Sequence, residues 1–167
     1  PAGSWRPIEQ ATIGYGYGLS VSLLQLARAY TVFARDGDVV PLSLLKLDAP
    51  PLAIPVLRPE TAVAMRGMLE MAVGPGGTAP RAAVPRYRVA GKTGTTKKYL
   101  DATGAYSDED VVASFIGLAP VDRPRVVIAV VLDAPQEDAS GGKGAAPVFA
   151  AVMLAALHQL GVPPDGP

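Results

Sequence analysis

The chain has 167 residues, a length that suits one domain, and its content of 49% hydrophobic and 18% charged residues excludes a wholly disordered protein. Its 15 lysines and arginines balance 15 aspartates and glutamates, and a net charge of zero argues against a surface built mainly to bind nucleic acid or an anionic membrane. The sequence has no cysteine and a single histidine, His158, which excludes disulfides, thiol catalysis and multi-histidine metal sites.

The first predicted helix runs from about Ser22 to Arg35. Ser22, followed three residues later by Gln25, has the pattern of a capping box, and Gly37 is a stop signal. Apolar residues at helical spacing predict one buried stripe, made of Leu23, Leu26, Ala27, Tyr30 and Ala34. The following residues 38–58 are rich in proline and are predicted to form short extended pieces.

A second helix is predicted to begin at Pro59, because proline suits the first helical position, and to end at Gly74 and Pro75. Its spacing predicts an inward face made of Ala62, Met65, Met68, Leu69 and Ala72, with Met71 also in the core. Residues 74–85 are rich in glycine and proline and indicate a loop.

The hydrophobic period then changes to that of strands, which are predicted at Tyr87–Thr95, Val111–Leu118 and Arg125–Leu132. Thr96–Asp110 is expected to be a polar connection, and Pro120–Pro124 a short hairpin turn. A final helix over about Ala146–Leu160 is apolar nearly all round, so it is expected to be largely buried against the sheet. The order of elements predicts an α+β fold, with an antiparallel sheet flanked by helices.

The segment with the strongest chemical signature is Gly91-Lys92-Thr93-Gly94-Thr95-Thr96. A phosphate-binding P-loop is one interpretation, but that motif needs glycine where Arg86 stands and a helix after the threonine, and the following residues do not predict one. The other interpretation is an edge strand beside an acyl-transfer site. Lys92 would supply a fixed positive charge, and Thr93 and Thr95 would supply hydroxyls on one face. The backbone N–H of Thr95 would supply one oxyanion-hole donor, and Gly94 would allow close packing on the opposite face.

Lys-Thr-Gly is the third signature motif of the penicillin-binding proteins and serine β-lactamases. The chain from about Trp5 to Pro164 resembles the cell-division branch of the class B penicillin-binding proteins, of the penicillin-binding protein 3 type. Beside the Lys-Thr-Gly strand, the segments that carry the resemblance, in the order of the family, are Ile13–Leu19, Leu23–Tyr30, Met65–Glu70, Gly76–Thr78, Ala113–Pro120, Gly141–Gly142 and Ala146–Phe149.

The family also needs a nucleophile motif, Ser-x-x-Lys, and a second motif, Ser-x-Asn, but the chain contains no asparagine. Ser-x-x-Lys occurs at Ser43–Lys46 and at Ser140–Lys143. Both are interpreted as chance matches, because prolines around Ser43 and two glycines after Ser140 disfavour the helix that such a serine should open. Residues 1–167 are therefore expected to form the C-terminal part of a transpeptidase domain that lacks the nucleophile-bearing half, and the isolated chain is expected to be inactive.

For the whole protein, the resemblance implies a peptidoglycan D,D-transpeptidase that cross-links stem peptides during septal cell-wall synthesis. A serine would attack the D-Ala-D-Ala carbonyl to form an acyl-enzyme, an amine from a neighbouring stem would resolve it, and β-lactams would acylate the same serine. The implied catalytic residues are Lys92 and Thr95. The implied substrate-binding residues are Thr93, Gly94, Thr95, Thr96, Lys97, Tyr106, Gly141 and Gly142. Lys97 either reaches a second carboxylate of the substrate or is a solvated lysine, and Tyr106 is expected in the loop before the second strand.

The resemblance further implies a place at the periplasmic face of the bacterial inner membrane, with an anchor upstream of residue 1. The partners that it implies are peptidoglycan stem peptides, β-lactams, the upstream part of the same protein and division proteins. We expect no nucleic acid, metal or cofactor. Two alternatives remain open from the sequence: a fragment of a serine β-lactamase, and a non-catalytic binding module that kept the fold and lost the chemistry.

Overall fold

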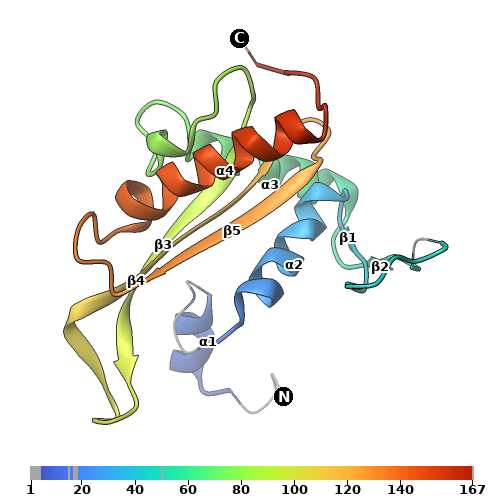
Figure 1. The fold of residues 1–167 in the computed structure, drawn as a ribbon. Helices are drawn as coiled ribbons and strands as arrows, with labels where there is room; N and C mark the ends of the chain where they lie inside the picture. Colours follow the sequence, from blue (N-terminus) through green and yellow to red (C-terminus); the bar gives the residue numbers. More distant parts are fainter. Residues whose placement is uncertain (1–4, 15, 17–18, 50, 167) are drawn as a thin grey trace.

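A three-stranded antiparallel sheet forms the middle layer of the computed structural model, which describes residues 5–14, 16, 19–49 and 51–166 (Figure 1). Its strands follow one another in space in the order β3, β4, β5, with bounds Ala90–Leu100, Ala105–Ala119 and Val126–Asp133. Helix α4 (Ala146–Gln159) covers one face, and helices α2 (Leu23–Ala34) and α3 (Pro59–Met71) pack against the other. This arrangement confirms the predicted α+β fold with helices flanking an antiparallel sheet.

The larger part of the core lies between the sheet and α4. The rings of Phe115 on β4 and Phe149 on α4 meet edge to face with centroids 4.6 Å apart, and both are fully buried. Gly91 on β3 lies below the same cluster, since a side chain there would come within 2.8 Å of the Phe115 ring. The packing of Gly91 against Phe115 therefore fixes the position of β3 at the residue that precedes Lys92.

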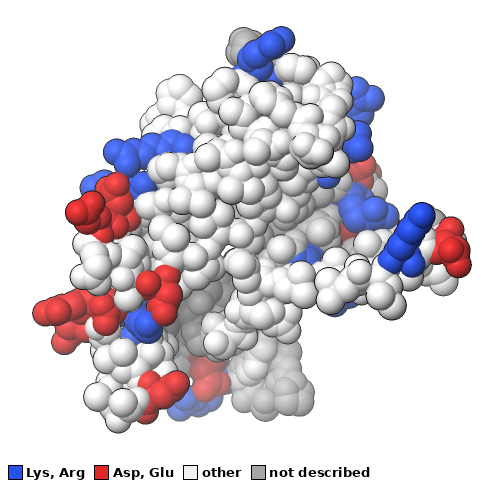
Figure 2. Space-filling model, in the orientation of Figure 1, with Lys and Arg blue, Asp and Glu red and all other residues white. Residues whose placement is uncertain are grey.

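Only one side of α4 is buried, so the expectation of a largely buried helix is wrong in part. Phe149 and Met153 on the inner side are fully buried, whereas Val148 and Val152 are 42% and 48% exposed. On the face drawn in Figure 2, uncharged residues cover the middle, and charged side chains gather at the margins. The stretch Gly141–Gln159 is the one helical stretch in the described part of the chain that is long and apolar enough to cross a membrane, although its inner side is packed on the sheet.

Helix α2 begins with the capping box that the sequence predicts. The Ser22 hydroxyl accepts a hydrogen bond from the backbone N–H of Gln25 (3.2 Å), and the Gln25 side chain accepts one from the N–H of Ser22 (2.8 Å). The helix ends as predicted, because Gly37 has a positive φ of 102°. The predicted buried stripe is wrong at its first member, Leu23, which is 46% exposed, and Val32 is the one residue of α2 that is buried.

Helix α3 starts at Pro59 as predicted but ends at Met71, before the predicted stop. Its buried stripe consists of Ala62, Arg66 and Leu69. The prediction that Met68 and Met71 belong to the core is wrong, since they are 62% and 75% exposed. They lie off the stripe that touches the sheet and α2. The buried guanidinium of Arg66 donates to the Phe33 carbonyl (2.6 Å) and to Asp36 (2.7 Å), so it joins α3 to the end of α2.

The predicted loop at 96–110 is instead the tip of a long hairpin. Strands β3 and β4 continue through it and turn only between Leu100 and Ala105, beyond the end of β5 (Figure 1). Cross-strand contacts stabilise this two-stranded part in place of a hydrophobic core: the rings of Tyr99 and Tyr106 have centroids 5.4 Å apart, and Lys97 pairs with Asp108 at 2.9 Å.

Smaller elements complete the structure. Helix α1 spans Pro7–Ile13, a two-stranded sheet joins β1 (Asp38–Val39) to β2 (Ile54–Pro55), and the short 3-10 helix η2 spans Pro80–Ala82. The predicted strand at Arg125–Leu132 agrees with β5 to within one residue at each end. Three residues of the segment at positions 13–19, to which the family resemblance extends, lie outside the described residues.

Candidate active site

Strand β3 carries the Lys-Thr-Gly-Thr segment at the edge of the sheet, hydrogen-bonded to β4 on one side. Because side chains alternate along a strand, Thr93 and Thr95 lie on the face that α4 covers, and Lys92 and Gly94 lie on the other. The register agrees, since Thr93 stands opposite Phe115, whose ring packs against α4. The predicted placement of both threonines on one face is therefore confirmed.

Gly94 is needed for close packing on the face away from Thr93, as predicted. It stands opposite Ser114 on β4, and a side chain at Gly94 would collide with the Ser114 hydroxyl. Gly141 approaches the same two strands, because a side chain there would come within 2.7 Å of the Gly94 carbonyl oxygen and closer still to that of Ser114. The Gly141 N–H donates to the Thr95 hydroxyl oxygen at 3.1 Å. The turn that begins at Gly141 is therefore held directly against the Lys-Thr-Gly-Thr segment.

Lys92 reaches around the sheet edge to the threonine face. Its ammonium donates hydrogen bonds to the carbonyl oxygen and to the hydroxyl oxygen of Thr93, both at 3.1 Å. The Thr93 hydroxyl in turn donates to the Thr78 hydroxyl oxygen at 3.3 Å. Lys92 is exposed, and within the described residues it forms no ion pair. These contacts form a chain from an ammonium through two hydroxyls.

A cavity of about 360 Å³ opens beside this chain. It is lined by Thr78, Pro80, Arg81, Thr93, Thr95, Ser140, Gly142 and Lys143. Gly142 leaves room for the neighbouring loop, since a side chain there would collide with the Thr78 carbonyl oxygen. The cavity therefore combines four hydroxyls and two cationic residues on its walls, with Lys92 bonded to one of those hydroxyls.

The sequence matches the family described as the penicillin binding protein transpeptidase domain over residues 1–154. The chain belongs to this family. The probable peptidoglycan D,D-transpeptidase PenA of Neisseria gonorrhoeae is 44% identical over 164 residues, which are 98% of this chain and 28% of that protein. These likenesses identify a transpeptidase domain of the class B penicillin-binding protein type.

Two solved structures of this family share the fold. The transpeptidase domain of Burkholderia pseudomallei penicillin-binding protein 3 matches with a TM-score of 0.91 and 48% identity, over 100% of this chain and 51% of that one. A mycobacterial penicillin-binding protein 3 solved in complex with aztreonam matches with a TM-score of 0.86 and 33% identity, over 100% of this chain and 41% of that one. The chain thus spans about half of the transpeptidase domain that it resembles.

Several of the predicted site residues of this transpeptidase chain meet at the cavity, and others do not. Thr93, Thr95 and Gly142 line it, and Gly141 adjoins it. Thr96 lies on the other face of β3 by alternation, and its hydroxyl donates to the backbone carbonyl of Lys97 at 3.0 Å.

Lys97 and Tyr106 lie farther along the hairpin. The ion pair that joins Lys97 to Asp108 leaves the two side chains 50% and 95% exposed. Tyr106 belongs to β4 and not to the preceding loop, so the expected location is wrong. It stands opposite Tyr99, about 13 Å along β3 from Thr95 at the usual rise per strand residue.

Five residues that line the cavity were not predicted as site residues: Thr78, Pro80, Arg81, Ser140 and Lys143. Ser140 caps the helical stretch that runs through Gly141–Ala145 into α4, and its hydroxyl accepts from the backbone N–H of Lys143 at 3.3 Å. Two glycines after Ser140 were expected to disfavour a helix there, but a π-helical turn over Gly141–Ala145 accommodates them. The hydroxyl bonds the Lys143 backbone, which is the role of a helix cap.

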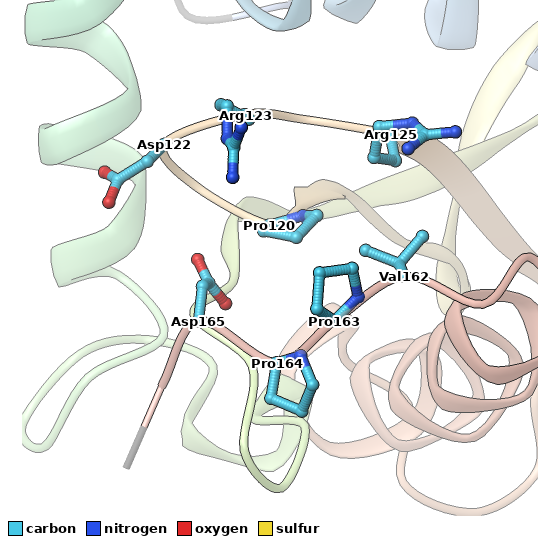
Figure 3. A pocket seen from close by; sticks show the side chains of 8 residues that line it. All are labelled: Pro120, Asp122, Arg123, Arg125, Val162, Pro163, Pro164 and Asp165. Atoms are coloured by element: carbon cyan, nitrogen blue, oxygen red, sulfur yellow. The ribbon is translucent and has the colours of Figure 1, made fainter.

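A second cavity, also of about 360 Å³, lies beyond the end of β4 and has different chemistry (Figure 3). It is lined by Pro120, Asp122, Arg123, Arg125, Val162, Pro163, Pro164 and Asp165, a set without hydroxyl or lysine side chains. One Asp165 oxygen accepts from the Arg88 backbone N–H at 2.9 Å, and the other is buried without a partner. Within the described residues, no group of three histidine, cysteine or acidic side chains could hold a metal ion.

Proposed function

We propose that this chain is the C-terminal part of the transpeptidase domain of a peptidoglycan D,D-transpeptidase, and that a segment outside it supplies the catalytic serine. The observation that carries the proposal is the hydrogen-bonded chain from Lys92 through Thr93 to Thr78 at the wall of a hydroxyl-lined cavity. The family supports the reaction class, and the share of the related domains that the chain spans supports a site completed by another segment.

In the proposed reaction, the serine oxygen attacks the carbonyl carbon of the penultimate D-Ala of a stem peptide. The peptide C–N bond breaks, and the terminal D-Ala leaves with a proton on its nitrogen. An amine of a neighbouring stem peptide then attacks the ester carbonyl, the serine oxygen regains a proton, and the cross-link forms. A β-lactam would acylate the same serine as its ring C–N bond opens, as the aztreonam complex of a relative suggests.

The residues of the site would divide this work between charge and hydrogen bonding. Lys92 would hold a positive charge next to the serine and take part in proton transfer. The Thr93 and Thr95 hydroxyls would bind the terminal carboxylate, and the Thr95 N–H would stabilise the oxyanion. Gly94, Gly141 and Gly142 would keep the wall narrow by leaving out side chains.

The outer edge of β3 would receive the rest of the substrate as an extended chain. Thr96, Lys97 and Tyr106 follow one another along this hairpin and would contact the more distant part of the stem peptide. We further propose that the protein acts in septal wall synthesis with division proteins, at the periplasmic face of the inner membrane, because its relatives are of the penicillin-binding protein 3 type.

The test is acylation of the intact protein, meaning this chain together with the segment that supplies the serine. Lys92→Ala should slow labelling by a fluorescent penicillin by about 10²-fold or more, since proton transfer by a positioned group contributes about that much. Lys98→Ala is the matched control: Lys98 pairs with Asp133 at 2.7 Å, away from the cavity, and its loss should leave labelling unchanged. Equal labelling of wild type and Lys92→Ala would refute the assignment. The isolated chain should not be labelled.

A further inference from the structure

Two cationic residues occupy the cavity wall formed by η2 and the turn after Ser140. Arg81 belongs to η2, and Ala82 in this short helix and Ala79 just before it are both fully buried. Its backbone is therefore held by packing, and Arg81 lines the cavity. Lys143 comes from the turn that follows Ser140, and its carbonyl oxygen accepts a hydrogen bond from Arg81 at 3.3 Å. The two residues thus form one contiguous rim, which we call the cationic rim.

The charge of the cationic rim is only partly neutralised. Arg81 pairs with Asp138 at 3.6 Å, a longer contact than a strong charge-assisted hydrogen bond, and the two side chains are 57% and 55% exposed. An exposed pair of this kind contributes little and is easily exchanged for another partner. In the described part of the chain, the Lys143 ammonium forms no ion pair. Two positive charges therefore face one weakly held carboxylate.

The hydroxyls below the cationic rim are arranged to donate to a ligand. A hydroxyl has a single hydrogen and two acceptor positions. Thr95 already accepts from the Gly141 N–H, and Ser140 accepts from the Lys143 N–H. Thr78 accepts from Thr93, because the lysine that bonds Thr93 can only donate. The hydrogens of Thr95, Ser140 and Thr78 are thus left for a ligand, so the cavity presents donors and positive charge.

We propose that Arg81 and Lys143 are specificity-determining residues that select ligands with a carboxylate in this cavity. The proposal rests on the function proposed above, which takes this cavity as the ligand-binding wall. The Lys-Thr-Gly-Thr strand bounds one side of the bound carboxylate, and the cationic rim bounds the other. Charges at the margin of a site raise the rate of productive encounter with an anion, and salt screens this effect.

The test compares two ligands that differ only in charge, benzylpenicillin and its methyl ester, as acylating agents of the intact protein. Replacing both rim residues, Arg81→Gln with Lys143→Gln, should lower the second-order rate constant for the acid about tenfold. It should change that for the ester less than about twofold, because the ester has no charge to attract. Raising the salt from about 0.05 M to about 0.5 M should slow acylation of the wild type by the acid and affect the double variant much less.

Two control variants separate charge from structure. Arg123→Gln removes the same charge at the second cavity and should leave the acid-to-ester preference unchanged. Arg81→Lys keeps the charge and should retain most of the preference. Equal slowing for acid and ester would assign the cationic rim a structural role and overturn the proposal, as would an unchanged preference in the double variant. A wild type that neither compound acylates would instead overturn the proposed transpeptidase function, and this inference with it.

Discussion

Replacing Gly141 by alanine tests how tightly the turn before α4 is held against the strand that carries Lys92. A methyl group at this position would meet the backbone of both β3 and β4: the Gly94 carbonyl oxygen at 2.7 Å, the Gly94 nitrogen at 3.0 Å, and the Ser114 carbonyl oxygen closer still. None of these atoms can rotate away as the end of a side chain can. The turn must therefore move away from the sheet, which breaks the hydrogen bond from the Gly141 N–H to Thr95.

The expected cost has two parts. Forcing one methyl group into a well-packed site costs about 1–3 kcal/mol. Losing a backbone hydrogen bond to a hydroxyl costs about 0.5–1.5 kcal/mol. Together they predict that Gly141→Ala lowers the free energy of unfolding by about 2–4 kcal/mol, which corresponds to a fall in melting temperature of about 5–12 °C for a domain of this size.

Thermal unfolding of two further glycine variants calibrates this number. Gly67→Ala lies inside α3 with no atom within 4 Å of the added methyl, and it should be neutral or stabilise by up to about 1 kcal/mol. Gly94→Ala meets only the Ser114 side chain, so adding Ser114→Ala should restore part of the loss. A melting temperature for Gly141→Ala within about 2 °C of the wild type would show that the turn is not held as described.

Two other predictions concern the face of the sheet that α2 and α3 cover. Arg66→Met should lower the free energy of unfolding by about 1–3 kcal/mol, because the Phe33 carbonyl loses its buried donor; an unchanged urea midpoint would argue against this role for the guanidinium. Burial raises the pKa of Tyr30 from 10.0 to about 12, so the fold favours the neutral phenol. The stabilisation that comes from burying the neutral Tyr30 phenol is complete below pH 10. It declines as the pH rises from about 10 to 12, because over this range Tyr30 ionises in the unfolded chain but stays neutral in the folded one. Between pH 10 and 12 the melting temperature of Tyr30→Phe should therefore fall less than that of the wild type. An equal fall in variant and wild type would contradict the assignment.

Local signals in the sequence predicted those parts of the fold and of the site that depend on neighbours in the chain. The capping box depends only on Ser22 and Gln25, which are three positions apart, and it forms as expected. The alternation of Thr93 and Thr95 follows from strand geometry alone. Close packing against Gly94 was also predicted, but the sequence alone did not show that Ser114 is the residue that packs there.

Features that depend on distant segments were missed. Arg81 is one arginine in a loop rich in glycine and proline, and its place at the cavity arises only when η2 packs beneath α4 and the turn after Ser140. The hairpin tip carries lysines and acids in place of an apolar alternation, so the sequence predicted a loop. The contacts that hold it, such as Tyr99 with Tyr106, join residues that are neighbours only after the strands pair. The exposed methionines of α3 illustrate the reverse error, in which a helical spacing was assumed to mean burial.

The contact of Gly141 with strands β3 and β4 distinguishes two kinds of sequence change in this molecule. A substitution at Gly141 disturbs a backbone-to-backbone fit, so it is costly for folding. Arg81 and Lys143, by contrast, are exposed at the cavity wall. Exposed positions of this kind can therefore change in sequence while the strand that carries Lys92 stays unchanged.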